Sequence, residues 1–502
     1  MAPTIITGKP PADAPHVTVA IVGAGACGLV AAIALRDAGI ECVVLERDAS
    51  PSGSSALSSG FIPAAGTAAQ KTQGISDSAA QFSSDIMGKT HGTAAPHLVQ
   101  AYASAIGPAL DQLQNAHGIA FEVLAGFLYP GHSVRRMHAV AERTGAALMA
   151  QLDRAATAAG ATLVTDALVR ELWRDDKGNM TGVGYQRPDG TIEHLQCEQL
   201  LLACNGFGGN AAMVKELLPE MRDATFAGHA GNDGSAIAWG RELGAHLADL
   251  GGYQGHGSWA VPQGALITWA LMMEGGVQLN ARGERFHDET QGYSEASVHV
   301  LAQPGGVAWN VFDGELLALA RTFPDFCSAE ALGAVKSCVG LAELAALIGC
   351  NAIFSVADYL GNHWAAGIID TEIQVKSGWD DTDPLSLRTR YAIHAPASYA
   401  NSSYSDNRIF KRQLQPPFYA IKVTGALFHT QGGLDIDAQC RVLRDDGSCF
   451  GNLLAAGGAA RGVSGNSVSG YLSGNGLLSA VAGGAIAART IIDATRSRHD
   501  SP

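Results

Sequence analysis

The sequence predicts an α/β fold in which a domain built on a parallel sheet carries an inserted α+β domain. Three observations lead to this prediction. An apolar run at residues 17–22 passes through a glycine-rich turn and a helix-like stretch into a second apolar run at 41–45. Further apolar runs typical of strands lie at 161–164 and 200–203. Residues 260–415 hold most of the tryptophans and show patchy periodicity, which indicates a separate domain.

The order of the remaining segments gives the expected domain boundaries. Apolar residues at helical spacing cover 93–117 and 141–159, and a long helix rich in glycine and alanine is expected at about 474–494. Because strands and glycine turns return after the middle region, the insert divides the first domain into two parts. We expect a disordered tail at 1–15, the first part of the sheet domain at 16–258, the insert at 259–415, the second part at 416–494, and a tail at 495–502.

The composition narrows the class of protein. The chain has 502 residues, of which 47% are hydrophobic and 16% charged, and its net charge is −14. This length allows two domains with large cores, and the negative charge disfavours a nucleic-acid partner. No apolar run reaches the roughly 18 residues that span a bilayer, and the start of the chain lacks the apolar block of a signal peptide. The nine scattered cysteines indicate reduced thiols, no bound metal and a cytoplasmic location.

The first apolar run ends in the turn Gly23-Ala24-Gly25-Ala26-Cys27-Gly28. In a strand–turn–helix unit of this spacing, the first glycine allows the turn, the second lets the backbone approach a pyrophosphate, and the third lets the helix pack on the strand. The helix N-terminus offers N–H groups and positive potential to the phosphates. Glu46 follows the second strand, 18 residues after Gly28, where it can accept hydrogen bonds from a ribose. We therefore predict a Rossmann-like domain that binds an adenine dinucleotide.

Four further segments indicate which adenine dinucleotide the domain binds, because together they resemble one family. They are similar to the loop that wraps the flavin, a strand ending in a glycine turn, a cap-domain signature and the second flavin-binding segment of the fumarate reductase/succinate dehydrogenase flavoprotein superfamily, which includes the 3-ketosteroid dehydrogenases. The resemblance implies a Rossmann-like FAD-binding domain with an inserted capping and substrate domain. The segments are 53–60 with 66–67, 201–210, 275–280 with 283–289, and 429–434 with 452–457.

The resemblance implies FAD as the cofactor and assigns residues to it. Relatives with covalent FAD attach it through a histidine in the loop corresponding to residues 54–60, and this loop contains none, so we expect non-covalent FAD. Gly458 stands where many relatives carry a glutamate. The residues expected at the cofactor are Gly23, Gly25, Ala26, Cys27, Gly28, Glu46, Arg47, Ser54, Ser55, Ser59, Gly60, Ala203, Asn205, Gly206, Asp233, His429, Gly457, Gly474, Asn475 and Leu477.

The same resemblance implies a substrate site that differs from that of the dicarboxylate enzymes. Those members hold carboxylates with arginines and a histidine. Here Tyr293, Phe428 and Tyr471 stand at three of these positions, and only His256 keeps a polar role. Losing two guanidinium groups removes most bidentate recognition of carboxylates. We therefore expect an apolar pocket with phenolic hydroxyls, which favours a neutral ketone over a diacid.

The steroid branch of the family indicates the catalytic residues. Tyr471-Leu472-Ser473 is similar to the Tyr-x-Ser element of 3-ketosteroid Δ4-(5α)-dehydrogenases, in which the tyrosine handles the proton next to the ketone and the serine relays it with a second tyrosine. We expect Tyr471 and Ser473 in these roles, with Tyr293 as the second tyrosine and Tyr359 or Tyr404 as weaker alternatives. The implied reaction removes the α proton of a cyclic ketone while flavin N5 accepts the β hydride.

Two other functions stay open at this point. The first is an FAD-dependent reductase or dehydrogenase of enoates or polar acids, of the fumarate, urocanate or tricarballylate type, drawing on Arg461, Arg136 or His256. The second is a non-enzymatic flavoprotein for redox sensing or electron transfer. The expected partners are a small-molecule substrate and an external electron acceptor. The expected substrate-binding residues are Phe428, His256 and Arg461.

Overall fold

The computed structural model describes residues 3–124, 128–350 and 414–499, and the chain divides into two units. The first unit contains Met1–Gly257, Gln291–Val298 and Gly425–Pro502, and the second contains Ser258–Thr290 and His299–Thr424. The sequence predicted one continuous insert at 259–415. Instead, the segment Gln291–Val298 returns to the first unit, and it carries Tyr293.

A nine-stranded mixed sheet forms the centre of the first unit. Its strands are β1 (Thr4–Thr7), β2 (His16–Val22), β3 (Cys42–Leu45), β7 (Thr162–Val164), β8 (Leu168–Arg174), β9 (Met180–Gln186), β10 (Ile192–Leu202), β20 (Arg441–Leu443) and β21 (Cys449–Ala455). The main path runs β1-β8-β9-β10-β2-β3-β7, and β21 pairs with the end of β10. Strands β10, β2, β3 and β7 are parallel, and the apolar ends of β10, β2 and β3 are buried, as expected for parallel strands covered on both faces. The predicted α/β class is confirmed.

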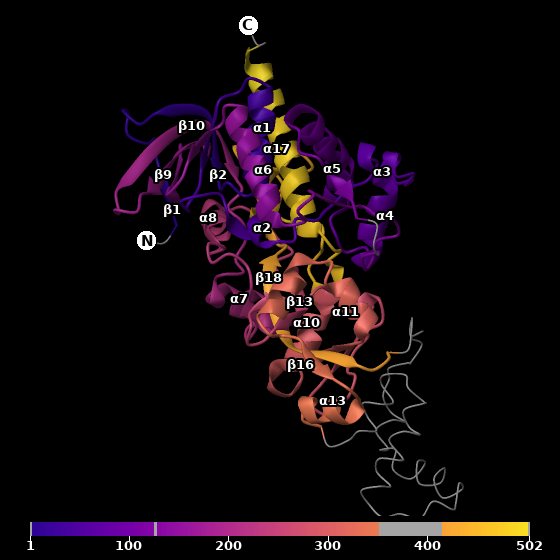
Figure 1. Ribbon diagram of the computed structural model, residues 1–502. Coiled ribbons are helices and arrows are strands. Elements are labelled where there is room, and N and C mark those ends of the chain that lie inside the picture. The colour runs from indigo at the N-terminus through magenta and orange to yellow at the C-terminus, as the bar shows by residue number, and fades with distance from the viewer. Residues whose placement is uncertain (1–2, 125–127, 351–413, 500–502) are drawn as a thin grey trace, which may run out of the picture. The chain divides into compact units, whose positions relative to one another are not determined.

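Three long helices pack together beside this sheet, as Figure 1 shows. They are α1 (Ala26–Asp37), α6 (Gly145–Ala158) and the C-terminal α17 (Asn475–His499), and α17 also contacts α5 (Pro96–His117). The glycines and alanines of α17 allow this close packing: a Cβ at Gly484 would lie 2.4 Å from the carbonyl oxygen of Cys27. The first motif predicted a strand, a glycine turn, a helix and a second strand. The strands are β2 and β3, the helix is α1, and the glycine turn lies between β2 and α1.

Shorter elements complete the first unit. The helices are α2 (Gly53–Leu57), α3 (Ala68–Thr72), α4 (Ala79–Lys89), α7 (Ala211–Leu217) and α8 (Ser235–Leu243). A three-stranded sheet is formed by β4 (Ile62–Pro63), β6 (Met137–Ala139) and β5 (Glu122–Val123), and β12 (Leu247–Ala248) pairs with β19 (Gly433–Leu434). The strand β11 (Thr225–Phe226) pairs with the end of β18 (Phe418–Thr430).

The second unit is an α+β arrangement around antiparallel strands. Its elements are β14 (Ala265–Leu266), α9 (Ala270–Met273), β15 (Val277–Leu279), β16 (Val307–Phe312), α11 (Gly314–Ala320), α12 (Pro324–Ala331), β17 (Lys336–Cys338) and α13 (Leu341–Ile348). Three elements cross the division between the units: β13 (Tyr253–Ala260), α10 (Tyr293–Leu301) and β18. Strand β16 pairs with residues 419–424 of β18 in antiparallel register.

Both expected tails differ from the prediction. Residues 4–7 form β1, which pairs in parallel with β8, because two isoleucines between threonines suit a strand. Residues 495–499 continue α17. This helix is also the one described helix that is long and apolar enough to cross a bilayer, from Asn475 to Ser497. Most of that stretch is buried within the protein, so we interpret α17 as a core helix.

Candidate active site

The glycine turn between β2 and α1 has the geometry that an anion-binding turn requires. Gly23 has a φ of +104°, and a Cβ there would lie 2.6 Å from the carbonyl oxygen of Ala203. At Gly28, a Cβ would lie 1.9 Å from the carbonyl oxygen of Gly23, so only glycine lets α1 begin this close to the turn. At Gly25, a Cβ would meet only Ser55 Oγ, at 3.7 Å, which leaves the backbone open to a ligand.

Glu46 lies at the end of β3 with its carboxylate turned toward this turn. The N–H of Ala24 donates to one carboxylate oxygen at 2.8 Å, and the N–H of Asp48 donates to the other at 3.0 Å. Burial raises the pKa of Glu46. Each oxygen keeps a lone pair for a further donor, which fits the expected contact with a ribose hydroxyl.

A polar cluster follows on the same side of the unit. Arg47 donates through Nη1 to the carbonyl oxygen of Gly231 at 3.1 Å and pairs with Asp233 at 3.5 Å. Ser54 Oγ accepts a hydrogen bond from Asn232 at 2.8 Å. The structure therefore brings Arg47, Ser54 and Asp233, which are far apart in the sequence, into one cluster.

The turn after β10 is closely packed. Asn205 has a φ of +67°, and its side-chain oxygen accepts the N–H of Gly206 at 2.9 Å. A Cβ at Gly458 would lie 2.1 Å from that same oxygen. This contact explains why a glycine fits at 458: the side-chain oxygen of Asn205 occupies the space that a Cβ would need.

The first turn of α17 contains buried polar atoms that have no partner among the described residues. They are Asn475 Oδ1 and Ser479 Oγ. The amide of Asn475 donates to Ser464 Oγ at 3.0 Å, and Ser464 in turn donates to Gln431 at 3.0 Å. Orphaned buried acceptors and donors cost free energy unless a ligand satisfies them. Together with the open backbone at Gly25, they fit a polar cofactor such as FAD.

The other predicted cofactor residues also fall within the first unit. Ser55 Oγ accepts the N–H of Ala26 at 3.3 Å, and Gly60 has a φ of +72° beside the start of α6. A Cβ at Gly476 would lie 2.6 Å from His429 Nε2, so this ring lies against the start of α17. The remaining predicted residues are Cys27, Ser59, Ala203, Gly206, Gly457, Gly474 and Leu477.

Four aromatic rings from distant segments form a cluster. The ring of His256, on β13, is stacked between Tyr293 and Phe428, with centroids 4.8 and 5.3 Å away. Tyr471 meets Tyr293 edge-on at 6.0 Å and His429 at 5.7 Å. These four side chains and His429 all belong to the first unit. The structure thus brings together Tyr293, Phe428, Tyr471 and His256 as the sequence predicted.

Burial keeps this cluster neutral. It lowers the pKa of His256 to about 3 and of His429 to about 4, so both imidazoles are uncharged at neutral pH. It raises the pKa of Tyr293 to about 12 and that of Tyr471 above its ordinary value, so both phenols keep their protons. The cluster therefore presents neutral hydrogen-bonding groups on an apolar surface.

The phenols meet the N-terminus of α17. Tyr471 Oη donates to Gln254 Oε1 at 3.0 Å. Burial raises the pKa of Tyr293, and Ser473, Tyr471 and the backbone N–H of Gly474 lower it against this larger effect. The N–H groups of Gly474 and Gly476 act on Tyr471 in the same direction. Donors at a helix N-terminus stabilise negative charge, so they reduce the cost of forming a phenolate here.

The two arginines considered for an acid substrate are already paired. Arg461 donates through Nε to Asp249 at 2.6 Å and through Nη1 to Asp435 at 3.3 Å. Arg136 is buried and pairs with Asp77 and Asp85. These ion pairs use Nε and Nη1 of Arg461, so they give this arginine a structural role, and its binding of a carboxylate substrate stays a prediction.

Sequence reasoning missed several residues of this site. Gln254 lies two positions before His256, in a segment whose histidine alone was considered. His132 contacts the backbone of Ser473, and no sequence pattern pointed to it. Tyr359 and Tyr404, the alternative second tyrosines, lie outside the described residues.

Comparisons with known proteins place these features in a family. The family model "FAD binding domain" matches residues 18–477. The NADH:fumarate oxidoreductase of Klebsiella pneumoniae is 26% identical over 449 residues, which is 89% of this chain and 45% of that protein. The probable fumarate reductase Ifc3 of Shewanella frigidimarina is 26% identical over 480 residues, which is 93% of this chain and 74% of that protein.

Solved structures share the fold. The 3-ketosteroid-Δ4-(5α)-dehydrogenase of Rhodococcus jostii RHA1 superimposes with a TM-score of 0.71 at 21% identity, covering 98% of this chain and all of that one. The chain thus spans less than half of the first relative and all of this structural neighbour.

Proposed function

The chain belongs to the FAD binding domain family and is an FAD-dependent oxidoreductase, and we propose that it desaturates a cyclic ketone, 3-ketosteroid-like or smaller, at the bond next to the carbonyl. The observation that carries this proposal is the neutral aromatic cluster of His256, Tyr293, Phe428 and Tyr471. Because buried phenols and uncharged imidazoles donate hydrogen bonds without a cation, they suit a ketone oxygen better than a carboxylate.

Bound FAD would supply a hydride acceptor at its N5 position. We propose that it binds without a covalent link, because residues 54–60 contain no histidine. Glu46 and the glycine turn would hold the adenosine and pyrophosphate. The N-terminus of α17 would face the flavin ring, with His429 beside it.

The proton step falls to the residues before α17. Ser473 lowers the pKa of Tyr293, and Tyr293 lies edge-on to Tyr471. We propose that Tyr471 first passes its own phenolic proton to Tyr293 and Ser473, and that the resulting phenolate then takes the α proton of the ketone and is a neutral phenol again. Because both phenols rest in the neutral form, dehydrogenation requires the donors of Gly474 and Gly476 to stabilise the transient phenolate.

A second candidate is reduction of an unsaturated acid, since the relatives of this chain include a probable fumarate reductase and a urocanate reductase. In that direction the neutral phenols would be proton donors as they stand. This candidate requires a cation for the carboxylate, and Arg136 and Arg461 are paired with aspartates.

An anaerobic titration separates the two candidates. The purified yellow protein is mixed with saturated cyclic ketones, including 3-ketosteroids, while the absorbance of oxidised flavin is followed. Bleaching by a ketone supports the proposal. If no ketone bleaches the flavin, and fumarate or urocanate reoxidises the chemically reduced protein, the acid candidate replaces it.

The remaining proposals concern the surroundings of the enzyme. The cysteines in the described part of the chain form no disulfide with one another. Free thiols throughout a chain are typical of a reducing compartment, which supports a cytoplasmic location. Electrons from the reduced protein would pass to an external acceptor, which the same titration can identify by adding quinones, dyes or dioxygen after bleaching.

A further inference from the structure

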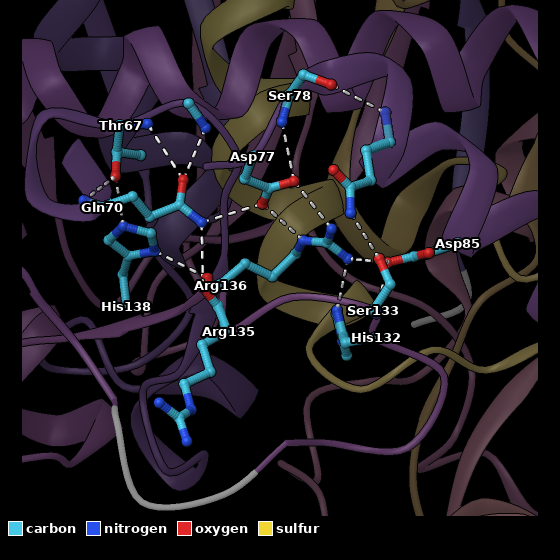
Figure 2. Close-up of polar contacts among 12 residues, drawn as sticks. Thr67, Gln70, Asp77, Ser78, Asp85, His132, Ser133, Arg135, Arg136 and His138 are labelled. Carbon is cyan, nitrogen blue, oxygen red and sulfur yellow. Dashed lines mark hydrogen bonds and ion pairs between the residues drawn. The ribbon is translucent and has the colours of Figure 1, made fainter. Parts of the chain in front are cut away.

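Arg136 is the centre of a buried polar network behind the start of α17. Its guanidinium binds Asp77 through two parallel hydrogen bonds, from Nε and Nη2, each 3.0 Å long. Its Nη1 also binds Asp85, which accepts two more hydrogen bonds of 2.8 Å from the backbone and side chain of Ser133. Figure 2 shows the guanidinium between the two carboxylates. This geometry leaves Arg136 a single orientation.

Arg136 also fixes the tautomer of His132. Its Nη1 lies 3.1 Å from His132 Nδ1, and His132 Nε2 lies 2.9 Å from the carbonyl oxygen of Ser473. A guanidinium only donates hydrogen bonds and a carbonyl only accepts them. Therefore Nδ1 carries no hydrogen, and Nε2–H donates to Ser473. Burial and the charge of Arg136 lower the pKa of His132 to about 4, in agreement with a neutral ring.

The carbonyl held by His132 belongs to the same peptide group as the N–H of Gly474. A trans peptide is planar, with its C=O and N–H pointing in opposite directions. That N–H lowers the pKa of Tyr293 and of Tyr471 against the larger effect of burial. The ring of His132 and the two phenols therefore lie at opposite ends of one peptide group.

This peptide needs such a restraint. Gly474 has a φ of +87°, and glycine accepts both signs of φ, so the backbone offers little resistance to a flip of the peptide before it. A flip would turn the N–H away from the phenols and direct the carbonyl oxygen toward them, which would repel a phenolate.

We propose that His132, held by Arg136, is a positioning residue that locks the Ser473–Gly474 peptide with its N–H facing Tyr293 and Tyr471. This inference rests on the proposed function for its catalytic consequence, but the lock itself does not. We propose that His132 acts on the two phenols through this peptide and not by direct contact.

The test compares His132→Leu with His132→Gln in the FAD-loaded protein. Leucine removes both hydrogen bonds, whereas the amide of glutamine can donate to Ser473 and its oxygen can accept from Arg136. The matched control is His138→Leu. His138 is also buried, and its ring binds Thr67 Oγ1 at 2.7 Å and the backbone carbonyl of Arg136 at 2.8 Å rather than the carbonyl of Ser473.

Two measurements are made on each variant. Hydrogen exchange, read by mass spectrometry on a peptide covering residues 472–478, requires no substrate. We expect faster exchange in His132→Leu than in wild type, His132→Gln or His138→Leu. With a ketone that bleaches the flavin, we expect kcat to fall roughly 10- to 100-fold in His132→Leu with KM unchanged, and glutamine to restore most of it.

The outcomes separate the two claims. If no ketone bleaches the flavin, the proposed function fails, while the exchange data still decide the lock. If a ketone bleaches the flavin but His132→Leu matches His138→Leu in exchange and in kcat, the lock is overturned. Equal losses of kcat in the leucine and glutamine variants would also overturn it, because they would indicate a role for the imidazole other than holding the carbonyl.

Discussion

Tyr471 donates its phenolic hydrogen to Gln254 Oε1 across 3.0 Å, which ties the turn before α17 to strand β13. Tyr293 raises the pKa of the same hydroxyl together with burial, whereas the N–H groups of Gly476 and Gly474 lower it. The bond to Gln254 therefore helps to fix the orientation of the hydroxyl whose phenolate we propose as the base. Gln254 becomes part of the site through this contact.

Replacing Tyr471 with phenylalanine tests this orientation. The variant keeps the ring packing against Tyr293 and His429 but loses the hydroxyl, so kcat for flavin reduction should fall at least about 100-fold, the usual effect of losing a general acid–base group. FAD content should not change. Stopped-flow bleaching by a ketone measures the rate, and Tyr185→Phe, whose hydroxyl binds Glu193 at 2.8 Å on the remote strand β9, is the control. A loss below threefold would contradict a catalytic Tyr471.

The buried imidazoles predict acid sensitivity. Burial lowers the pKa of His256 to about 3, below the ordinary value of about 6.5, so the unfolded chain binds more protons than the folded one below pH 6.5. Stability from this group is present above pH 6.5 and is lost as the pH falls. Between pH 7 and pH 5 the loss should be about 2 kcal/mol for this one group.

Urea unfolding of the FAD-loaded protein at the two pH values measures this dependence. His256→Phe keeps a flat ring between Tyr293 and Phe428 and removes the titrating group, so its stability should change about 2 kcal/mol less between the same pH values. If the free energy of unfolding depends on pH in His256→Phe as strongly as it does in wild type, the imidazole is not held neutral by burial.

Substitution of Arg461 tests whether this side chain belongs to a structural ion pair or binds the substrate. It joins Asp249 and Asp435 within the first unit, and its side chain is 19% exposed. Arg461→Ala should therefore lower the free energy of unfolding by about 2 kcal/mol, as expected for lost charged hydrogen bonds, without changing KM for the ketone. Exposed Arg489, paired only with Asp493 at 3.6 Å, is the control for removing an arginine. A large rise in KM confined to carboxylate substrates would instead make Arg461 a ligand.

The sequence predicted those parts of the site that depend on local spacing. The glycine turn, Glu46 and the start of α17 all follow from short motifs whose backbone geometry is fixed by a few residues. The paired state of Arg461 could not be predicted, because Asp249 and Asp435 are brought to it by β12 and β19. Tyr293 was expected in the insert, yet its segment lies in the first unit, because unit boundaries depend on long-range packing that periodicity does not report. The lock on Ser473 depends on a histidine 341 residues away in sequence.

The glycine at 458 gives a last prediction, because it replaces the glutamate of related sequences. A Cβ at this position would lie 2.1 Å from Asn205 Oδ1 and 3.2 Å from the N–H nitrogen of Gly206. Gly458→Glu should therefore displace the turn after β10 and weaken FAD binding by roughly tenfold or more, since overpacking of such a site costs about 1–3 kcal/mol. Gly88→Ala, in open space on α4, controls for adding a side chain. Adding Asn205→Gly to Gly458→Glu removes the clash and should restore FAD binding, measured by fluorescence titration of the apoprotein. If the double variant binds FAD no better than Gly458→Glu alone, the asparagine does not occupy the place of the missing side chain.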